Sequence, residues 1–82
     1  GYNRELLAGD ICYYMEEYPD AITHYEMAQA MCPVRFAPLE GLYKVYDATG
    51  DTLHLKEIAA QIATKQVKVN SSDVMRIKRR CR

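Results

Sequence analysis

The side chains that could support acid–base, nucleophilic or metal chemistry are few and scattered along the chain. Two histidines, His24 and His54, lie far apart, and three cysteines occur singly, as Cys12, Cys32 and Cys81. No pair has metal-ligand spacing, and an odd count does not suggest a disulfide framework. No Cys/His or Ser/His/Asp arrangement and no glycine-rich phosphate loop can be assembled. We therefore expect solvated histidines, buried cysteines used for packing, no cofactor and no enzymatic activity.

A small acidic group, Glu16, Glu17 and Asp20, could suggest paired carboxylates for acid–base work. These residues lie where one predicted helix ends and the next begins. Acidic side chains stabilise the positive N-terminal end of a helix, so we favour this structural role.

Charge is balanced over the 82 residues, with 11 basic and 11 acidic side chains, which argues against nucleic acid as a partner. The bases concentrate at the C-terminus, in a patch of five: Arg76, Lys78, Arg79, Arg80 and Arg82. Cations suit the negative end of a helix and the polar outer face of a terminal one. We favour a capping role for this basic patch, and contact with anionic membrane lipids remains an alternative.

Apolar residues recur at helical spacing almost throughout, with no alternation long enough for a sheet. This predicts helices over about residues 4–15, 19–31 and 36–48, another after Gly50-Asp51, and a last one over 71–82. Val67–Val69 is expected to be a short extended connector. Helices this short must pack on one another, so the sequence predicts one small all-α domain.

An internal repeat supports a more specific architecture. The first block reads Gly9, Tyr13, Tyr18, Ala21, Tyr25, Ala28 and Pro33, and it resembles the tetratricopeptide repeat. The resemblance implies that Gly9 and Ala21 let paired helices approach and that Tyr25 fills the space between neighbouring repeats. Pro33 would end the second helix.

The second block, offset by about 34 residues, is a looser match. It reads Tyr43, Asp47, Thr52, Leu55, Ala59, Ile62 and Val67, with Tyr43 in place of the glycine and no closing proline. The resemblance covers about residues 2–67. It implies two antiparallel helix pairs of an α–α superhelix, with repeat one at 2–35, repeat two at 36–69 and a capping helix at 71–82. A non-repeat helical bundle is the alternative, and it leaves the common offset unexplained.

A closer resemblance involves the segments Met31–Leu39, Gly41–Tyr43 and Lys65–Val69, together with Ser72, Val74, Ile77 and Lys78. They are similar to the C-terminal tetratricopeptide region of bacterial O-antigen polymerase/ligase-type membrane proteins, although Gln66 stands where a proline is expected. This implies a soluble domain attached to a bacterial inner-membrane protein, with the catalytic part outside this chain. No stretch approaches the roughly 20 apolar residues of a membrane span. The start at Gly1, without Met, fits a piece of a longer protein.

Tetratricopeptide modules bind extended peptides in a groove lined by the first helix of each pair. The resemblance assigns this groove to seven residues: Leu6, Asp10, Tyr13, Tyr14, Glu40, Lys44 and Asp47. Its acids disfavour an anionic peptide end, and at least one of Tyr13 and Tyr14 is expected in the core. The predicted function is a protein–protein interaction module. The alternative is a structural or oligomerisation appendage. Because two helix pairs are near the minimum for this architecture, we expect exposed apolar edges that pair in a homodimer or pack on further repeats.

Overall fold

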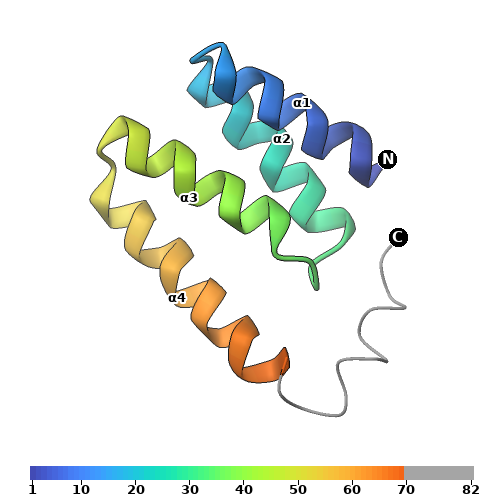
Figure 1. Cartoon of the computed structure of the whole chain (residues 1–82), viewed down its shortest axis with the longest axis vertical. Helices are drawn as coiled ribbons and strands as arrows, with labels where there is room; N and C mark the ends of the chain where they lie inside the picture. The colour runs from blue at the N-terminus through green and yellow to red at the C-terminus, as the bar shows by residue number, and fades with distance from the viewer. Residues whose placement is uncertain (70–82) are drawn as a thin grey trace.

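The first four helices expected from the sequence are present in the computed structural model, which describes residues 1–69 and their side chains as far as Lys65. Within this part of the chain, four helices follow one another: α1 (Tyr2–Tyr14), α2 (Tyr18–Met31), α3 (Ala37–Thr49) and α4 (Thr52–Val69). Each packs antiparallel to the next, and α1 also contacts α3 (Figure 1). The predicted all-α fold is therefore confirmed.

The helix ends follow from local residue chemistry. Pro19 lies in the first turn of α2, where its missing N–H leaves no bond unmade. Gly50 ends α3 with φ 74°, a left-handed conformation that favours glycine. The Asp51 carboxylate then accepts a hydrogen bond from the His54 backbone N–H at 3.2 Å, which caps α4. These predicted start and stop signals are confirmed.

The predicted connector at Val67–Val69 is wrong, because α4 continues through Val69. No glycine or proline interrupts residues 52–69. The two valines lower helix propensity by only a few tenths of a kcal/mol each, which does not end an established helix. The predicted capping helix at 71–82, with its basic patch, lies outside the described residues.

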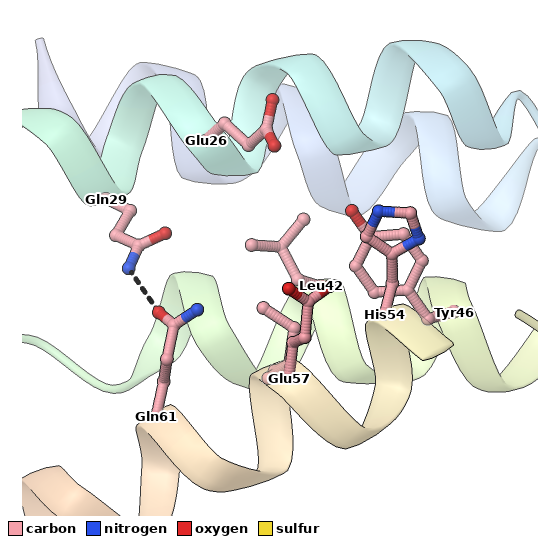
Figure 2. A pocket seen from close by; sticks show the side chains of 8 residues that line it. Glu26, Gln29, Leu42, Tyr46, His54, Glu57 and Gln61 are labelled. Carbon is pink, nitrogen blue, oxygen red and sulfur yellow. Dashed lines mark hydrogen bonds between the residues drawn. The ribbon is translucent and has the colours of Figure 1, made fainter. Parts of the chain in front are cut away.

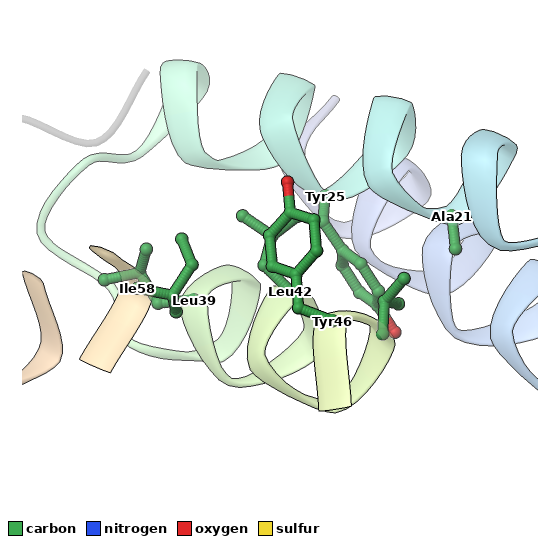
Figure 3. Packing of buried hydrophobic residues seen from close by; sticks show 7 residues of the cluster. Ala21, Tyr25, Leu39, Leu42, Tyr46 and Ile58 are labelled. Carbon is green, nitrogen blue, oxygen red and sulfur yellow. The ribbon is translucent and has the colours of Figure 1, made fainter. Parts of the chain in front are cut away.

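The core lies between α2, α3 and α4 (Figure 3). Helix α3 supplies most of it, through the buried side chains of Leu39, Leu42, Val45 and Tyr46. Ile58 on α4 closes one side. Because α3 contacts the other three helices, its position fixes the position of every surface described below.

Tyr25 on α2 joins the two helix pairs. Its buried ring lies between Gly9 on α1 and Gly41 on α3, and a Cβ atom on Gly9 would come within 2.7 Å of the ring. A Cβ atom on Gly41 would collide with the same atoms of the ring. Only glycine allows both helices to approach the ring this closely. The repeat alignment put Tyr43 at the second small position, but Tyr43 is exposed and Gly41 contacts the ring.

Candidate functional site

The predicted groove begins at Asp10 on α1, beside the Tyr25 wedge. The Tyr25 hydroxyl donates a hydrogen bond of 2.5 Å to the Asp10 carboxylate. Burial raises the pKa of Tyr25 well above its usual value, and the hydrogen bond and negative charge of Asp10 raise it further. Tyr25 is therefore a neutral donor that holds one oxygen of an otherwise exposed carboxylate in place.

The remaining α1 groove residues divide between core and surface. Leu6 and Tyr13 are partly buried and pack against the core cluster. Tyr14 is 82% exposed, and its ring meets that of Tyr13 edge to face at 5.8 Å between centroids. One of the two tyrosines does pack against the core, as expected, and the other presents a large aromatic surface to solvent.

On α3, the groove residues Glu40, Lys44 and Asp47 are all exposed. Their spacing puts them on one side of the helix, opposite the buried Leu42. Together with Asp10, the surface carries three carboxylates and one ammonium group. Its net negative charge favours cationic groups over anionic ones. We refer to Asp10, Tyr14, Glu40, Lys44 and Asp47 as the α1–α3 surface.

Both histidines contact other side chains, which the sequence did not predict. His24 is half-buried, and its Nδ1 lies 2.7 Å from a carboxylate oxygen of Glu5 on α1. The expectation of a solvated His24 is therefore wrong, because the partner comes from a distant part of the sequence. His54 is exposed, but its ring stacks on Tyr46 with 4.9 Å between centroids.

His54 also pairs at 2.7 Å with Asp51, the residue that immediately precedes α4. The hydrogen bond between the two raises the pKa of His54 above its usual value. The same contact, with the bond from the His54 backbone N–H, lowers the pKa of Asp51. The pair stabilises the beginning of α4 and belongs to the helix cap.

A hollow of about 230 Å³ lies between α2 and α4, over α3, on a different part of the molecule from the predicted groove (Figure 2). Its lining is mostly polar and comprises Glu26, Gln29, Leu42, Tyr46, His54, Glu57, Ile58 and Gln61. Gln29 donates a 3.2 Å hydrogen bond to Gln61 across it. Sequence reasoning missed this hollow, because only the packing of α2 and α4 on α3 brings these residues together.

The acidic residue Asp20 and the cysteines, which the sequence also offered for chemistry, lie at helix ends or in partly or fully buried positions where the structure describes them. Asp20 lies in the first turn of α2, where its charge suits the helix dipole. Cys32 is fully buried and Cys12 partly buried, whereas Cys81 lies outside the described residues. Across residues 1–69 no group of three potential ligand side chains could hold a metal ion. No helix in this part of the chain has the length and hydropathy to cross a membrane.

Comparisons with known proteins give no assignment. The chain matches no protein-family model, no curated protein and no solved structure.

Proposed function

We propose that this chain is a tetratricopeptide-type protein-interaction module whose α1–α3 surface binds an extended segment of a partner protein. The observation that carries the proposal is the position of Tyr25 between Gly9 and Gly41. This wedge fixes α1 against α3 and leaves a charged and aromatic surface outside the core. Such a preorganised surface loses little conformational entropy on binding.

The charge and shape of the α1–α3 surface favour a particular ligand chemistry. Tyr14 offers an exposed ring suited to apolar side chains or to a cation, and tyrosine is frequent at binding hot spots. Asp10, Glu40 and Asp47 would pair with lysine or arginine. We therefore propose a neutral or basic segment as the ligand and disfavour one that binds through a terminal carboxylate.

The proposed setting is a bacterial membrane-bound protein of polysaccharide assembly, of which this chain would be a non-enzymatic part. Its support is the resemblance of Met31–Leu39 and Lys65–Val69 to the C-terminal region of such proteins. A parent sequence with several apolar stretches of about 20 residues would agree with this setting. A parent without any would contradict it.

The binding proposal can be tested with peptides selected against the purified chain from a library of random linear sequences. We expect the selected peptides to be neutral or basic. Calorimetry should show that Tyr14→Ser weakens their binding by about tenfold or more, as expected at a hot spot. Lys44→Glu should strengthen the binding of basic peptides, because it removes the only cation of the α1–α3 surface.

Leu53→Ser is the matched control, because Leu53 is a large exposed side chain on α4, away from the α1–α3 surface. Helicity measured by circular dichroism should stay unchanged in all three variants. Selection of only acidic peptides would contradict the proposal, and so would binding that survives Tyr14→Ser but is lost in Leu53→Ser.

A further inference from the structure

The hollow between α2 and α4 is closed at both ends by contacts between helices (Figure 2). At one end the ring of His54 on α4 stacks on the ring of Tyr46 on α3. At the other end Gln29 on α2 donates its hydrogen bond to Gln61 on α4. The buried side chain of Leu42 lies beneath the space between the two ends. The hollow is therefore a defined site with an apolar floor and polar walls.

Two carboxylates line this hollow from different helices. Glu26 belongs to α2 and Glu57 to α4, and both lie between the two closed ends (Figure 2). Neither forms an ion pair or a hydrogen bond with the rest of the described chain. His54 does not neutralise them, because its Nδ1 already pairs with Asp51. Carboxylates that share a site repel each other, so a cation bound between them would be stabilised from both walls.

Tyr46 brings an unpaired hydroxyl to the same hollow. The residue is only 7% exposed, yet its hydroxyl has no hydrogen-bond partner within the described part of the chain. Burial raises the pKa of Tyr46 above its usual value. The negative charges of Glu26, Asp51 and Glu57 raise this pKa further, so the phenol is protonated and lies in their field. A buried polar group without a partner is costly, which indicates a position that a ligand atom completes.

We propose that the hollow binds a guanidinium group, as found on an arginine side chain or on a small alkylguanidine. Glu26 and Glu57 accept N–H groups from the two walls, and the Tyr46 hydroxyl oxygen accepts another. A guanidinium carries five N–H donors in one plane and can therefore reach several acceptors at once, whereas an ammonium group is a compact point charge. A metal ion is disfavoured, because residues 1–69 bring no three suitable ligand side chains together.

The size and position of the hollow agree with one small group. Its volume of about 230 Å³ lies below the roughly 300–1,000 Å³ of sites for drug-sized ligands. Glu26, Glu57 and Gln61 are exposed, so a ligand can enter from solvent. The inference does not rest on the proposed peptide binding, because none of the residues lining the hollow belongs to the α1–α3 surface.

The test is a chemical-shift titration of the isotope-labelled 82-residue chain with ethylguanidinium and with N-acetyl-arginine amide. We expect the side-chain NH₂ signals of Gln29 and Gln61 to shift, with a dissociation constant of about 1 mM for a group this small. Tighter binding of ethylguanidinium would indicate a free small molecule as the natural ligand. Tighter binding of the blocked arginine would indicate an arginine side chain of a polypeptide.

Ethylurea is the matched ligand control, because it has nearly the same shape as ethylguanidinium and no charge. It should produce no shifts at Gln29 and Gln61. Equal shifts with ethylurea would overturn the proposal, as would the absence of shifts at both glutamines up to tens of millimolar ethylguanidinium. Shifts confined to the α1–α3 surface would also overturn it, while leaving the proposed peptide binding intact.

Variants of the two glutamates test the role of charge. Glu26→Gln and Glu57→Gln should each weaken ethylguanidinium binding by about tenfold, because each removes a charge-assisted hydrogen bond. Glu16→Gln makes the same change at an exposed glutamate outside the hollow and should bind normally. Wild-type affinity in both hollow variants would overturn the proposal.

Tyr46→Phe separates ligand binding from folding. It removes only the unpaired hydroxyl, so the free energy of unfolding should stay the same or rise. The affinity for ethylguanidinium should fall about fivefold, because the ligand loses one acceptor. A loss of stability with unchanged affinity would show that the hydroxyl serves the fold and would contradict its place in the site.

Discussion

At the scale of single residues, Tyr25 determines how the two helix pairs meet. Its ring atoms lie nearest to glycines on both α1 and α3, and its hydroxyl reaches Asp10 at the edge of the α1–α3 surface. The same ring therefore packs the core and orients a carboxylate on the surface where we propose that a partner binds.

Alanine at either glycine should destabilise the fold. Gly9→Ala and Gly41→Ala each press a methyl group against the Tyr25 ring, which is buried and has little room to move. Overpacking costs about 1–3 kcal/mol, and the better helix propensity of alanine offsets up to about 1 kcal/mol of it. We expect a net loss of about 1–2 kcal/mol in urea unfolding. The loss should shrink in a Tyr25→Leu background, and an unchanged loss there would show that the ring is not the obstacle.

Tyr25→Phe isolates the hydroxyl. Loss of a hydrogen bond to a charged group should cost about 1–2 kcal/mol near neutral pH, since the freed Asp10 carboxylate regains water. Tyr14→Phe, which alters a solvent-exposed hydroxyl, should leave the free energy of unfolding unchanged.

The pH dependence of the same variant follows from the raised pKa of Tyr25 in the folded state. The unfolded phenol ionises near pH 10, whereas the folded one stays protonated to higher pH. The contribution of Tyr25 to stability is therefore complete below about pH 10 and is lost as the pH rises further. Urea unfolding above pH 10 should show a shallower decline for Tyr25→Phe than for the wild type. Equal declines would mean that the hydroxyl ionises normally.

That Tyr25 packs between helices could be expected from the sequence, because it occupies the large aromatic position of the tetratricopeptide pattern that the sequence resembles. The contacts of Gly41 and His24 could not be predicted from the sequence. Gly41 lies two positions before the one that the repeat alignment assigned, and the contact between His24 and Glu5 joins residues 19 apart in the chain. Local spacing contains no information on which side chains two packed helices bring together.

At the scale of helices, the predicted boundaries hold where a residue has a strong local effect and fail where none does. Pro19, Pro33, Gly50 and Asp51 lie at the observed ends of α2, α3 and α4. At the end of α4 the only local signal was a pair of valines, which favour extended structure too weakly to stop a helix. The hollow beside α4 could not be predicted from the sequence either, because it forms only when α2 and α4 both pack on α3.

The Asp51–His54 pair should control the stability of the α4 cap in a pH-dependent way. The lowered pKa of Asp51 gives a stabilisation that is present above about pH 4 and lost as the pH falls. The raised pKa of His54 gives one that is complete below about pH 6.5 and lost as the pH rises. The pair therefore contributes most between these values.

Thermal unfolding of Asp51→Asn and Asp51→Ala tests the pH-dependent contribution of the Asp51–His54 pair to stability. Asparagine keeps an oxygen for the cap, so Asp51→Asn should lower the melting temperature chiefly between about pH 4 and pH 6.5. Asp51→Ala should lower it at every pH. Identical profiles for the two variants would contradict a separate contribution from the charged pair.

At the scale of the whole molecule, α3 makes the fold cooperative because it contacts every other helix. Leu42→Ala removes a fully buried side chain in its centre and should cost about 2–5 kcal/mol, a large fraction of the stability of a domain this small. We expect tyrosine fluorescence and circular dichroism to lose signal at the same urea concentration, which Leu42→Ala shifts strongly downward. Leu53→Ala, at an exposed site, should shift it little. Separate transitions for the two signals would show that the helix pairs unfold independently.

The central claim is that the α1–α3 surface, positioned by the Tyr25 wedge, binds a protein segment. The most direct measurement is an amide chemical-shift titration of the isotope-labelled chain with a library-selected neutral or basic peptide. We predict that the largest changes fall on α1 and α3, at Asp10, Tyr14, Glu40, Lys44 and Asp47. Changes confined to the hollow between α2 and α4, or no changes at saturating peptide, would contradict the claim.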